Sequence, residues 1–264
     1  MDWRASLFGV HGRLSLRRGA GRPVVVAIPP SPLLEALRSA PKTNDMDKAK
    51  ASFERYRTGQ FWQNDPGYAF AKPWLRQWIA QETRVLDVGC AYGQLAWYLK
   101  SLGIWEKAHY HGVDVVEAAV ELAATAHPEG TFEATDAQAG LGVATGDFDV
   151  VWSKGTICSA AFPQELLAQI LAVQAPRVLL PHTAMACEPI HGGFATTIYS
   201  APHTAYLFTI LDQAGFTQQV NAAGYDVTIC TPRDYTVPVE HMGTYRLYDV
   251  VLTASSKSSM KRPA

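Results

Sequence analysis

The sequence has almost no net charge, few cysteines and no long hydrophobic run, and each of these features argues against a class of protein. Its 264 residues carry 23 lysines and arginines against 24 acidic residues, a net charge of −1, so no global basic field attracts nucleic acid. No stripe of basic residues with interleaved aromatic residues is present either. We therefore expect no nucleic-acid partner and favour small-molecule substrates.

Cysteine is scarce and scattered through the chain. None of the four cysteines has the C-x-x-C spacing of a zinc site, and their pattern argues against a disulfide framework, so we expect no metal. Unpaired thiols suit a reducing compartment, which predicts a cytoplasmic protein. The longest aliphatic stretch near the start, Val24–Ile28, is far too short to span a bilayer, so no membrane association is expected. The cysteines are Cys90, Cys158, Cys187 and Cys230.

Hydrophobic residues make up 48% of the chain and charged residues 18%, which is typical of a soluble globule. The length accommodates one sizeable α/β domain with appendages. Residues 1–46 are rich in arginine, poor in acids and interrupted by prolines, so we predict that they form a disordered extension. Residues 255–264 are predicted to form a disordered tail. An organelle transit peptide and a natural start at Met46 are the alternative explanations of the extension.

The stretch VLDVGCAYGQLAWYL, Val85–Leu99, predicts a strand, a tight turn and a helix in succession. Gly89, Ala91 and Gly93 give the turn almost no side-chain bulk, so backbone can approach a ligand there. The helix expected from Gln94 presents free N–H groups, which favour a carboxylate or phosphate. The stretch indicates a cofactor site, although a corner that needs small residues only for packing has the same pattern.

The sequence of this turn can be compared with the patterns of two kinds of cofactor site. A dinucleotide fingerprint, G-x-G-x-x-G, fits poorly because Gln94 and Leu95 stand where small residues are expected. The pattern acid-x-Gly-x-Gly-x-Gly fits better, with Asp87 as the acid and alanine at the middle glycine. In this pattern the chain resembles motif I of the class I S-adenosylmethionine-dependent methyltransferases.

This resemblance implies S-adenosylmethionine as the cofactor. Asp114, 25 positions after Gly89, corresponds to the acid that meets the ribose hydroxyls, although it could equally cap the helix that follows. Asp136 corresponds to the acid that reads the adenine edge together with the next backbone N–H. The strand FDVVW, Phe148–Trp152, resembles the family's fourth-strand motif, whose end faces the transferred methyl group. The predicted cofactor-binding residues are Asp87, Gly89, Cys90, Ala91, Gly93, Asp114, Val115, Asp136, Ala137, Ser153 and Lys154.

Strands and helices alternate along residues 47–254, which are predicted to form the methyltransferase domain. The expected fold is α/β, a Rossmann-like seven-stranded sheet that is mostly parallel with an antiparallel last strand and has helices on both faces. Residues 198–216 resemble the helix that precedes the last hairpin in many small-molecule methyltransferases, which implies a helix that ends at Gly215. Residues 47–62 are predicted to form an amphipathic helix, and the residues 61–75 that follow are rich in aromatic side chains. This segment either packs on the edge of the sheet or forms a lid over the ligand, which Tyr68 and Lys72 would then contact.

The stretch Pro181–His203 has no clear periodicity and follows the fifth expected strand, where loops of such folds carry function. It is predicted to form a substrate wall and to hold a general base, for which the candidates are His182, Glu188 and His191. A hydroxyl acceptor needs such a base, whereas a carboxylate acceptor does not.

The sequence therefore predicts an S-adenosylmethionine-dependent methyltransferase that acts on a small molecule at a hydroxyl oxygen. The alternatives are a nicotinamide-dependent oxidoreductase on a similar fold and a non-catalytic adenosylmethionine-binding protein. No oligomeric state is indicated by the sequence.

Overall fold

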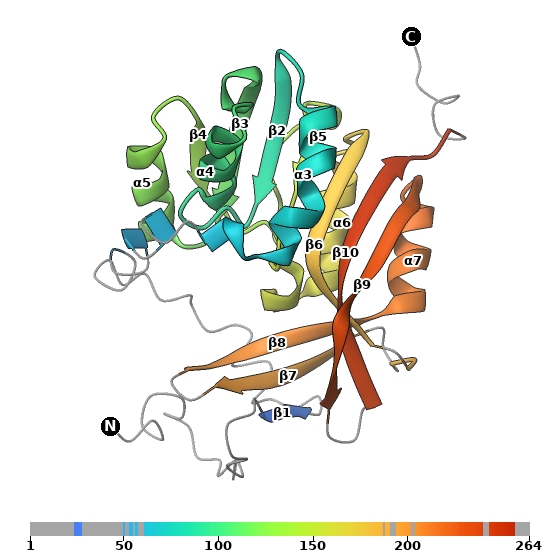
Figure 1. Ribbon diagram of the computed structural model, residues 1–264. Coiled ribbons are helices and arrows are strands. Elements are labelled where there is room, and N and C mark those ends of the chain that lie inside the picture. The colour runs from blue at the N-terminus through green and yellow to red at the C-terminus, as the bar shows by residue number, and fades with distance from the viewer. Residues whose placement is uncertain are drawn as a thin grey trace.

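The structure is a computed structural model, and it describes residues 24–27, 50, 53–54, 56–57, 61–186, 188–190, 194–201, 204–239 and 243–256. Its centre is one mixed sheet with helices on both faces (Figure 1). Among the described helices, none combines the length and the hydropathy of a membrane span.

The seven predicted strands are all present, and the fold class is confirmed. β2, β3, β4, β5 and β6 run parallel to one another, in the spatial order β6-β5-β2-β3-β4. β10 pairs antiparallel with β6, and β9 pairs antiparallel with β10. The bounds are β2 Thr83–Val88, β3 Ala108–Asp114, β4 Thr131–Ala134, β5 Val150–Trp152, β6 Arg177–Ala186, β9 Tyr225–Val239 and β10 Gly243–Ala254.

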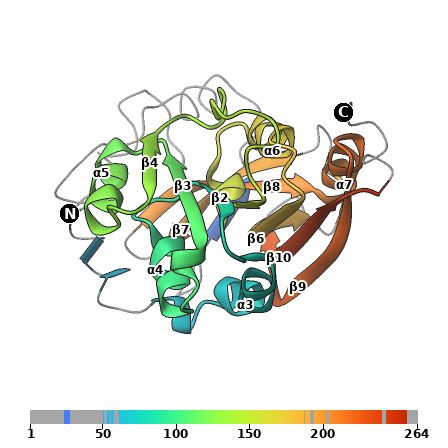
Figure 2. The same ribbon diagram turned by 90° about the horizontal axis from the view of Figure 1, so that it is seen from above.

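Helices cover both faces of this sheet because their apolar residues return with a helical period. Buried residues of α3 and α4 pack on one face, and those of α6 and α7 pack on the other, as the view from above shows (Figure 2). α5 lies beside β3 and β4. The bounds are α3 Pro66–Trp78, α4 Gln94–Ser101, α5 Glu117–Ala126, α6 Pro163–Ala172 and α7 Gln213–Ala222.

The prediction of a helix over residues 198–216 is wrong. The chain forms two antiparallel strands there, β7 Phe194–Ala201 and β8 Thr204–Asp212, and α7 begins only after Asp212. Asp212 is the N-cap of α7, where its carboxylate accepts the Gly215 N–H at 2.6 Å, so Gly215 lies in the first turn of the helix. The segment ATTIYSA is rich in β-branched and aromatic residues, which favour a strand.

The β7 and β8 strands extend the sheet below the carboxyl end of the parallel strand β2 (Figure 1). β6 continues past the end of β5, and β8 pairs parallel with its last residues, Met185 and Ala186. β1 Val24–Ala27 then pairs antiparallel with β7. Four residues of the stretch 1–46 therefore belong to the sheet, while the rest of that stretch lies outside the described residues.

The segment before β2 is only partly described. Residues 50, 53–54 and 56–57 are helical, a 3-10 turn spans Phe61–Gln63, and α3 follows. Phe53 lies 5.3 Å from Trp97 and 6.3 Å from Tyr92, measured between ring centroids, so the predicted helix packs on the turn after β2. The tail beyond Ser256 lies outside the described residues.

His127 packs inside an aromatic cluster behind this turn. Its ring is fully buried, 5.0 Å from the Trp97 ring and 5.9 Å from the Trp105 ring, and neither of its nitrogens has a hydrogen-bond partner within the described part of the chain. Burial lowers the pKa of His127 to about 4, from a usual value of 6.5. The neutral imidazole therefore acts as an apolar ring in this cluster.

We predict that His127 makes the protein sensitive to acid. Between pH 6.5 and about 4 the unfolded chain binds a proton at His127 and the folded chain does not, so the free energy of unfolding falls as the pH is lowered. The loss amounts to about 3 kcal/mol over that interval. In His127→Phe this part of the pH dependence should disappear, measured as urea unfolding at pH 4.5 and 7, whereas His109→Gln on the surface should retain it. An unaltered pH dependence in His127→Phe would contradict the prediction.

Candidate functional site

The turn after β2 adopts the left-handed backbone conformation at every second residue. The φ angles are +79° at Gly89, +46° at Ala91 and +74° at Gly93. The N–H groups of Gly89 and Cys90 both donate to the carbonyl oxygen of Val113, at 2.8 and 3.0 Å, which ties the turn to the end of β3. Glycine is favoured at residues 89 and 93 because it has no Cβ and enters this conformation at low cost, whereas Ala91 adopts it with a steric penalty.

Gly89 also lacks room for a side chain. A Cβ at this position would overlap Oγ1 of Thr156, and that hydroxyl donates to the carbonyl oxygen of Val88 at 3.0 Å. The close approach of two chain segments explains the glycine independently of its φ angle. The turn therefore passes directly over the loop that follows β5.

Asp114, the last residue of the neighbouring strand β3, stabilises the turn through hydrogen bonds. One carboxylate oxygen accepts the Ala91 N–H at 2.9 Å and the other accepts the Val116 N–H at 2.9 Å. The next side chain, Val115, is 43% exposed and is the one exposed large hydrophobic residue in the described part of the chain. A carboxylate beside an exposed apolar side chain suits a ligand with both hydroxyl groups and a flat apolar ring.

The predicted acids at the ends of β2 and β4 lie on either side of Asp114. Asp87 is buried and accepts the Tyr110 hydroxyl at 2.5 Å. Burial, opposed by this hydrogen bond and aided by the charge of Asp114, raises the pKa of Asp87 to about 7. Asp136 accepts the Gln138 N–H at 3.0 Å, and Ala137 next to it is partly buried. The structure thus brings these predicted cofactor residues to one edge of the sheet.

Ser153 and Lys154 follow β5 at the same edge. Ser153 is 1% exposed, and its hydroxyl has no hydrogen-bond partner among the residues that the structure describes. The ammonium of Lys154 lies 2.7 Å from Oδ2 of Asp65 and 5.0 Å from the ring centroid of Tyr68. Lys154 is also close enough to Asp87 to lower its pKa.

Asp65 belongs to this site, although the sequence indicates only a turn there. It is the N-cap of α3, and its Oδ1 accepts the Gly67 N–H at 2.8 Å. Asp-Pro at the start of a helix is the local signal that could have found the cap. Burial would raise the pKa of Asp65, but Lys154 and His182 together hold it below its usual value. Of the predicted lid residues, Tyr68 is buried and Lys72 is exposed.

His182 lies in a β-bulge of β6. Thr183 pairs with Tyr248 and Leu180 pairs with Val250, so Pro181 and His182 together face the single residue Asp249. The φ angle of His182 is +63°, and its N–H donates to Oδ1 of Asp249 at 3.1 Å. A bulge re-aims a side chain. The ring nitrogen Nε2 of His182 lies 3.7 Å from Oδ1 of Asp65.

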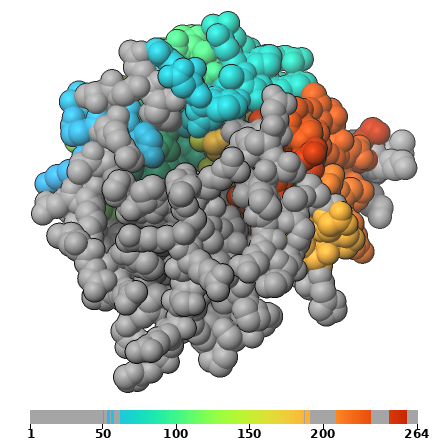
Figure 3. Space-filling model, turned by 60° about the horizontal axis from the view of Figure 1, so that its bottom comes forward, coloured from blue at the N-terminus to red at the C-terminus, as the bar shows by residue number. Residues whose placement is uncertain are grey.

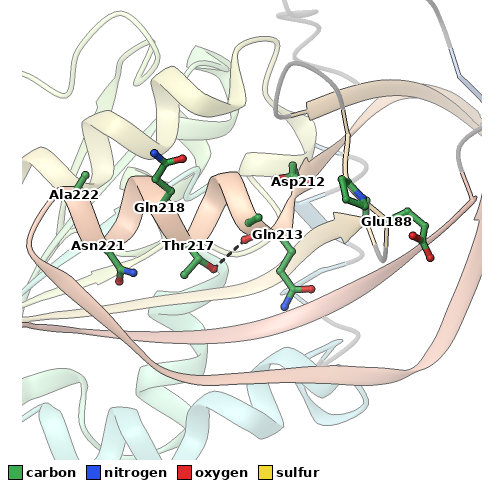
Figure 4. Close-up of a pocket in the computed structure, with 10 residues that line it drawn as sticks. Glu188, Asp212, Gln213, Thr217, Gln218, Asn221 and Ala222 are labelled. Atoms are coloured by element: carbon green, nitrogen blue, oxygen red, sulfur yellow. Dashed lines mark hydrogen bonds between the residues drawn. The ribbon is translucent and has the colours of Figure 1, made fainter.

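The other two candidate bases do not join His182 in the described structure. Glu188 is exposed and lines an open groove of about 900 Å³ beside α7, together with Asp212, Gln213 and Thr217 (Figure 4). Ala186, at the end of β6, is already roughly 13 Å along the strand from His182. His191 lies outside the described residues.

Figure 3 shows the molecule with the bottom of Figure 1 turned forward. Described residues of the segment before β2, α3 included (blue to cyan), lie along the left and upper borders of this face, and those of α7, β9 and β10 (orange to red) lie at its right. Lys154, Asp65 and His182 connect the cofactor turn at one end with the bulge of β6 at the other.

Comparison with known proteins agrees with this geometry. A family model described as a methyltransferase domain matches residues 85–177, which run from β2 to the start of β6. Over these residues the chain therefore matches a methyltransferase domain. No curated protein matches the chain in sequence.

Solved structures share the fold of this methyltransferase domain. A SAM-dependent methyltransferase from Methanosarcina mazei is 13% identical, with a TM-score of 0.53, over 69% of this chain and 97% of the other. The N-terminal domain of EvdMO1 with SAH bound is 17% identical, with a TM-score of 0.51, over 72% and 82%. A protein from Pyrococcus horikoshii OT3 is 13% identical, with a TM-score of 0.50, over 70% and 88%.

We predict that Gly89→Ala destabilises the domain by about 2 to 4 kcal/mol, because it combines left-handed strain with a clash against Thr156. Gly142 is the matched control. Its φ is +67°, and no described atom, apart from its chain neighbours, lies within 4 Å of the place that an alanine Cβ would take. Gly142→Ala should therefore cost only about 1 kcal/mol. Chemical unfolding of both variants measures the difference. Equal losses of stability in the two variants would mean that Gly89 and Thr156 are not closely packed, and would contradict the prediction.

Proposed function

We propose that this protein transfers a methyl group from S-adenosylmethionine to a hydroxyl oxygen of a small molecule. The observation that carries the proposal is the chain of contacts along one sheet edge. It runs from the left-handed turn and Asp87, through Lys154 and Asp65, to His182. A cofactor site and a candidate base therefore lie within reach of one bound molecule.

The residues at the turn fit the cofactor. A carboxylate can accept more than two hydrogen bonds, so Asp114 can hold the two N–H groups and also accept from ribose hydroxyls. The exposed Val115 would cover one face of the adenine ring, and Asp136 would accept from the adenine edge. Asp87, once deprotonated, would offset the positive charge of the cofactor. The similar domain of EvdMO1, solved with SAH bound, supports this assignment.

S-adenosylmethionine, when bound, supplies an electrophilic methyl group on a sulfonium. The protein's own part is to align the acceptor oxygen, exclude water and take the hydroxyl proton, and alignment alone contributes about 7 to 11 kcal/mol in favourable cases. We assign the proton to His182, because the bulge turns its imidazole toward Asp65 and Lys154 at the end of β5. Glu188 and His191 stay alternative candidates.

We predict that Val115→Ser weakens binding of S-adenosylmethionine and S-adenosylhomocysteine about tenfold, because it removes roughly 1.4 kcal/mol of apolar contact with the adenine ring. The side chain is exposed, so the melting temperature should not change. Calorimetric titration of wild type and variant measures both affinities.

The same titration with NAD distinguishes the two cofactor families. Binding of NAD alone would refute the methyltransferase proposal and favour the oxidoreductase. Saturable binding of S-adenosylmethionine with no turnover on a broad acceptor panel would favour a non-catalytic binding protein instead.

For a hydroxyl acceptor found in that panel, we predict that His182→Gln lowers kcat about a hundredfold to ten-thousandfold, because no base takes the proton. The affinity for S-adenosylmethionine should stay the same. Transfer to an acceptor that is already a carboxylate should be unaffected. A loss of hydroxyl methylation in Glu188→Gln but not in His182→Gln would move the role of base to Glu188.

A further inference from the structure

Asp65 occupies a position between the two polar side chains that face the expected acceptor. Its Oδ2 lies 2.7 Å from the Lys154 ammonium, and its Oδ1 lies 3.7 Å from Nε2 of His182. The side chains of Asp65 and Lys154 are each 18% exposed, and that of His182 is 23% exposed. Because these side chains are largely buried, a carboxylate acts on its neighbours more strongly here than it would on the surface.

The carboxylate of Asp65 cannot turn away from this position without losing a helix cap. Its Oδ1 accepts the Gly67 N–H at 2.8 Å, and the following Pro66 fixes the start of α3. The orientation of Asp65 is therefore set by the helix and not by its two polar neighbours.

The imidazole of His182 is fixed from the opposite side. The Asp249 carboxylate accepts the backbone N–H that the bulge leaves outside the ladder, and this bond supports the left-handed φ of His182. The thiol of Cys158 lies 3.6 Å from the carbonyl oxygen of the same residue. The backbone of His182 is thus held by β10 and the loop after β5, so only the ring can adjust.

We propose that Asp65 is a positioning residue for His182: its carboxylate selects the imidazole tautomer protonated at Nε2 and leaves Nδ1 to accept the acceptor's proton. The inference rests on the proposed function for the proton transfer. At 3.7 Å the contact is longer than a hydrogen bond, and a small rotation of the ring about the fixed backbone closes it when the acceptor binds. A carboxylate that orients a base in this way also raises its basicity.

Lys154 opposes this action of Asp65. Its ammonium and the imidazole of His182 both lie near the Asp65 carboxylate, and the positive charge of the ammonium partly offsets the effect of the carboxylate on the imidazole. Removing Asp65 and removing Lys154 should therefore change the titration of His182 in opposite directions. Within the described part of the chain, Asp65 before α3 lies nearest the ring of His182 with Lys154 beyond it, and Asp249 on β10 and Cys158 after β5 contact its backbone.

The test is NMR of the full chain with ¹³C- and ¹⁵N-labelled histidine, where the His182 signals are assigned by their loss in His182→Gln. In wild type we expect the neutral ring to be protonated at Nε2. In Asp65→Asn, which keeps a good helix cap, we expect the tautomers to mix and the titration midpoint to fall by about 0.5 to 1 pH unit. In Lys154→Met we expect the midpoint to rise.

Glu133→Gln is the matched control, because Oε2 of Glu133 lies 3.6 Å from Nε2 of another histidine, His111. It should move the His111 signals and leave those of His182 in place. An unchanged tautomer and midpoint of His182 in Asp65→Asn would overturn the proposal, as would a shift of the same sign in Asp65→Asn and Lys154→Met.

The kinetic test uses the hydroxyl acceptor from the panel. Asp65→Asn should lower kcat in the wild-type background and have little further effect in the His182→Gln background, because both changes act on one proton transfer. Additive losses would overturn the proposal. The NMR measurement needs neither cofactor nor acceptor, so a failure to bind S-adenosylmethionine refutes the proposed function separately and leaves the tautomer result standing.

Discussion

The two hydrogen bonds that the Asp114 carboxylate accepts are the constraint on which the site depends. They join the N–H of Ala91, in a left-handed turn, to the N–H of Val116, at the start of α5. Ala91 carries a Cβ at positive φ, which is a costly conformation that persists only when its surroundings determine it fully. The carbonyl oxygen of Val113, which accepts two further N–H groups, completes that support.

The cofactor edge could be predicted from the sequence because each of its elements is local. A strand that ends in an acid, and a turn of small residues, are patterns a few residues long, and the alternation of strands and helices then places their ends together. Asp87, Asp114 and Asp136 lie at or just after the carboxyl ends of β2, β3 and β4, which are neighbours in the sheet. Their roles toward a cofactor stay predictions, as does the division of the chain into domain, extension and tail.

The contacts around His182 could not be predicted because they link distant residues. Asp65, Lys154 and His182 come from three separate loops and strands, and the bulge that aims His182 depends on Asp249, which is 67 positions further along the chain. The helix expected over residues 198–216 rested on a resemblance of the sequence, whereas the antiparallel pairing of β7 with β8 makes most of these residues strands.

The short strand β1 has a consequence for how the protein folds. Val24 pairs with Ser200, so the outermost strand of the sheet joins residues 176 positions apart, and β7 must be in place before β1 can add to it. Contacts of such long sequence separation are slow to form, because the loop between them must close first. During synthesis the parallel strands β2 to β5 can assemble before β7 and β8 have been made, so the turn after β2 should form before β1 is added to the sheet.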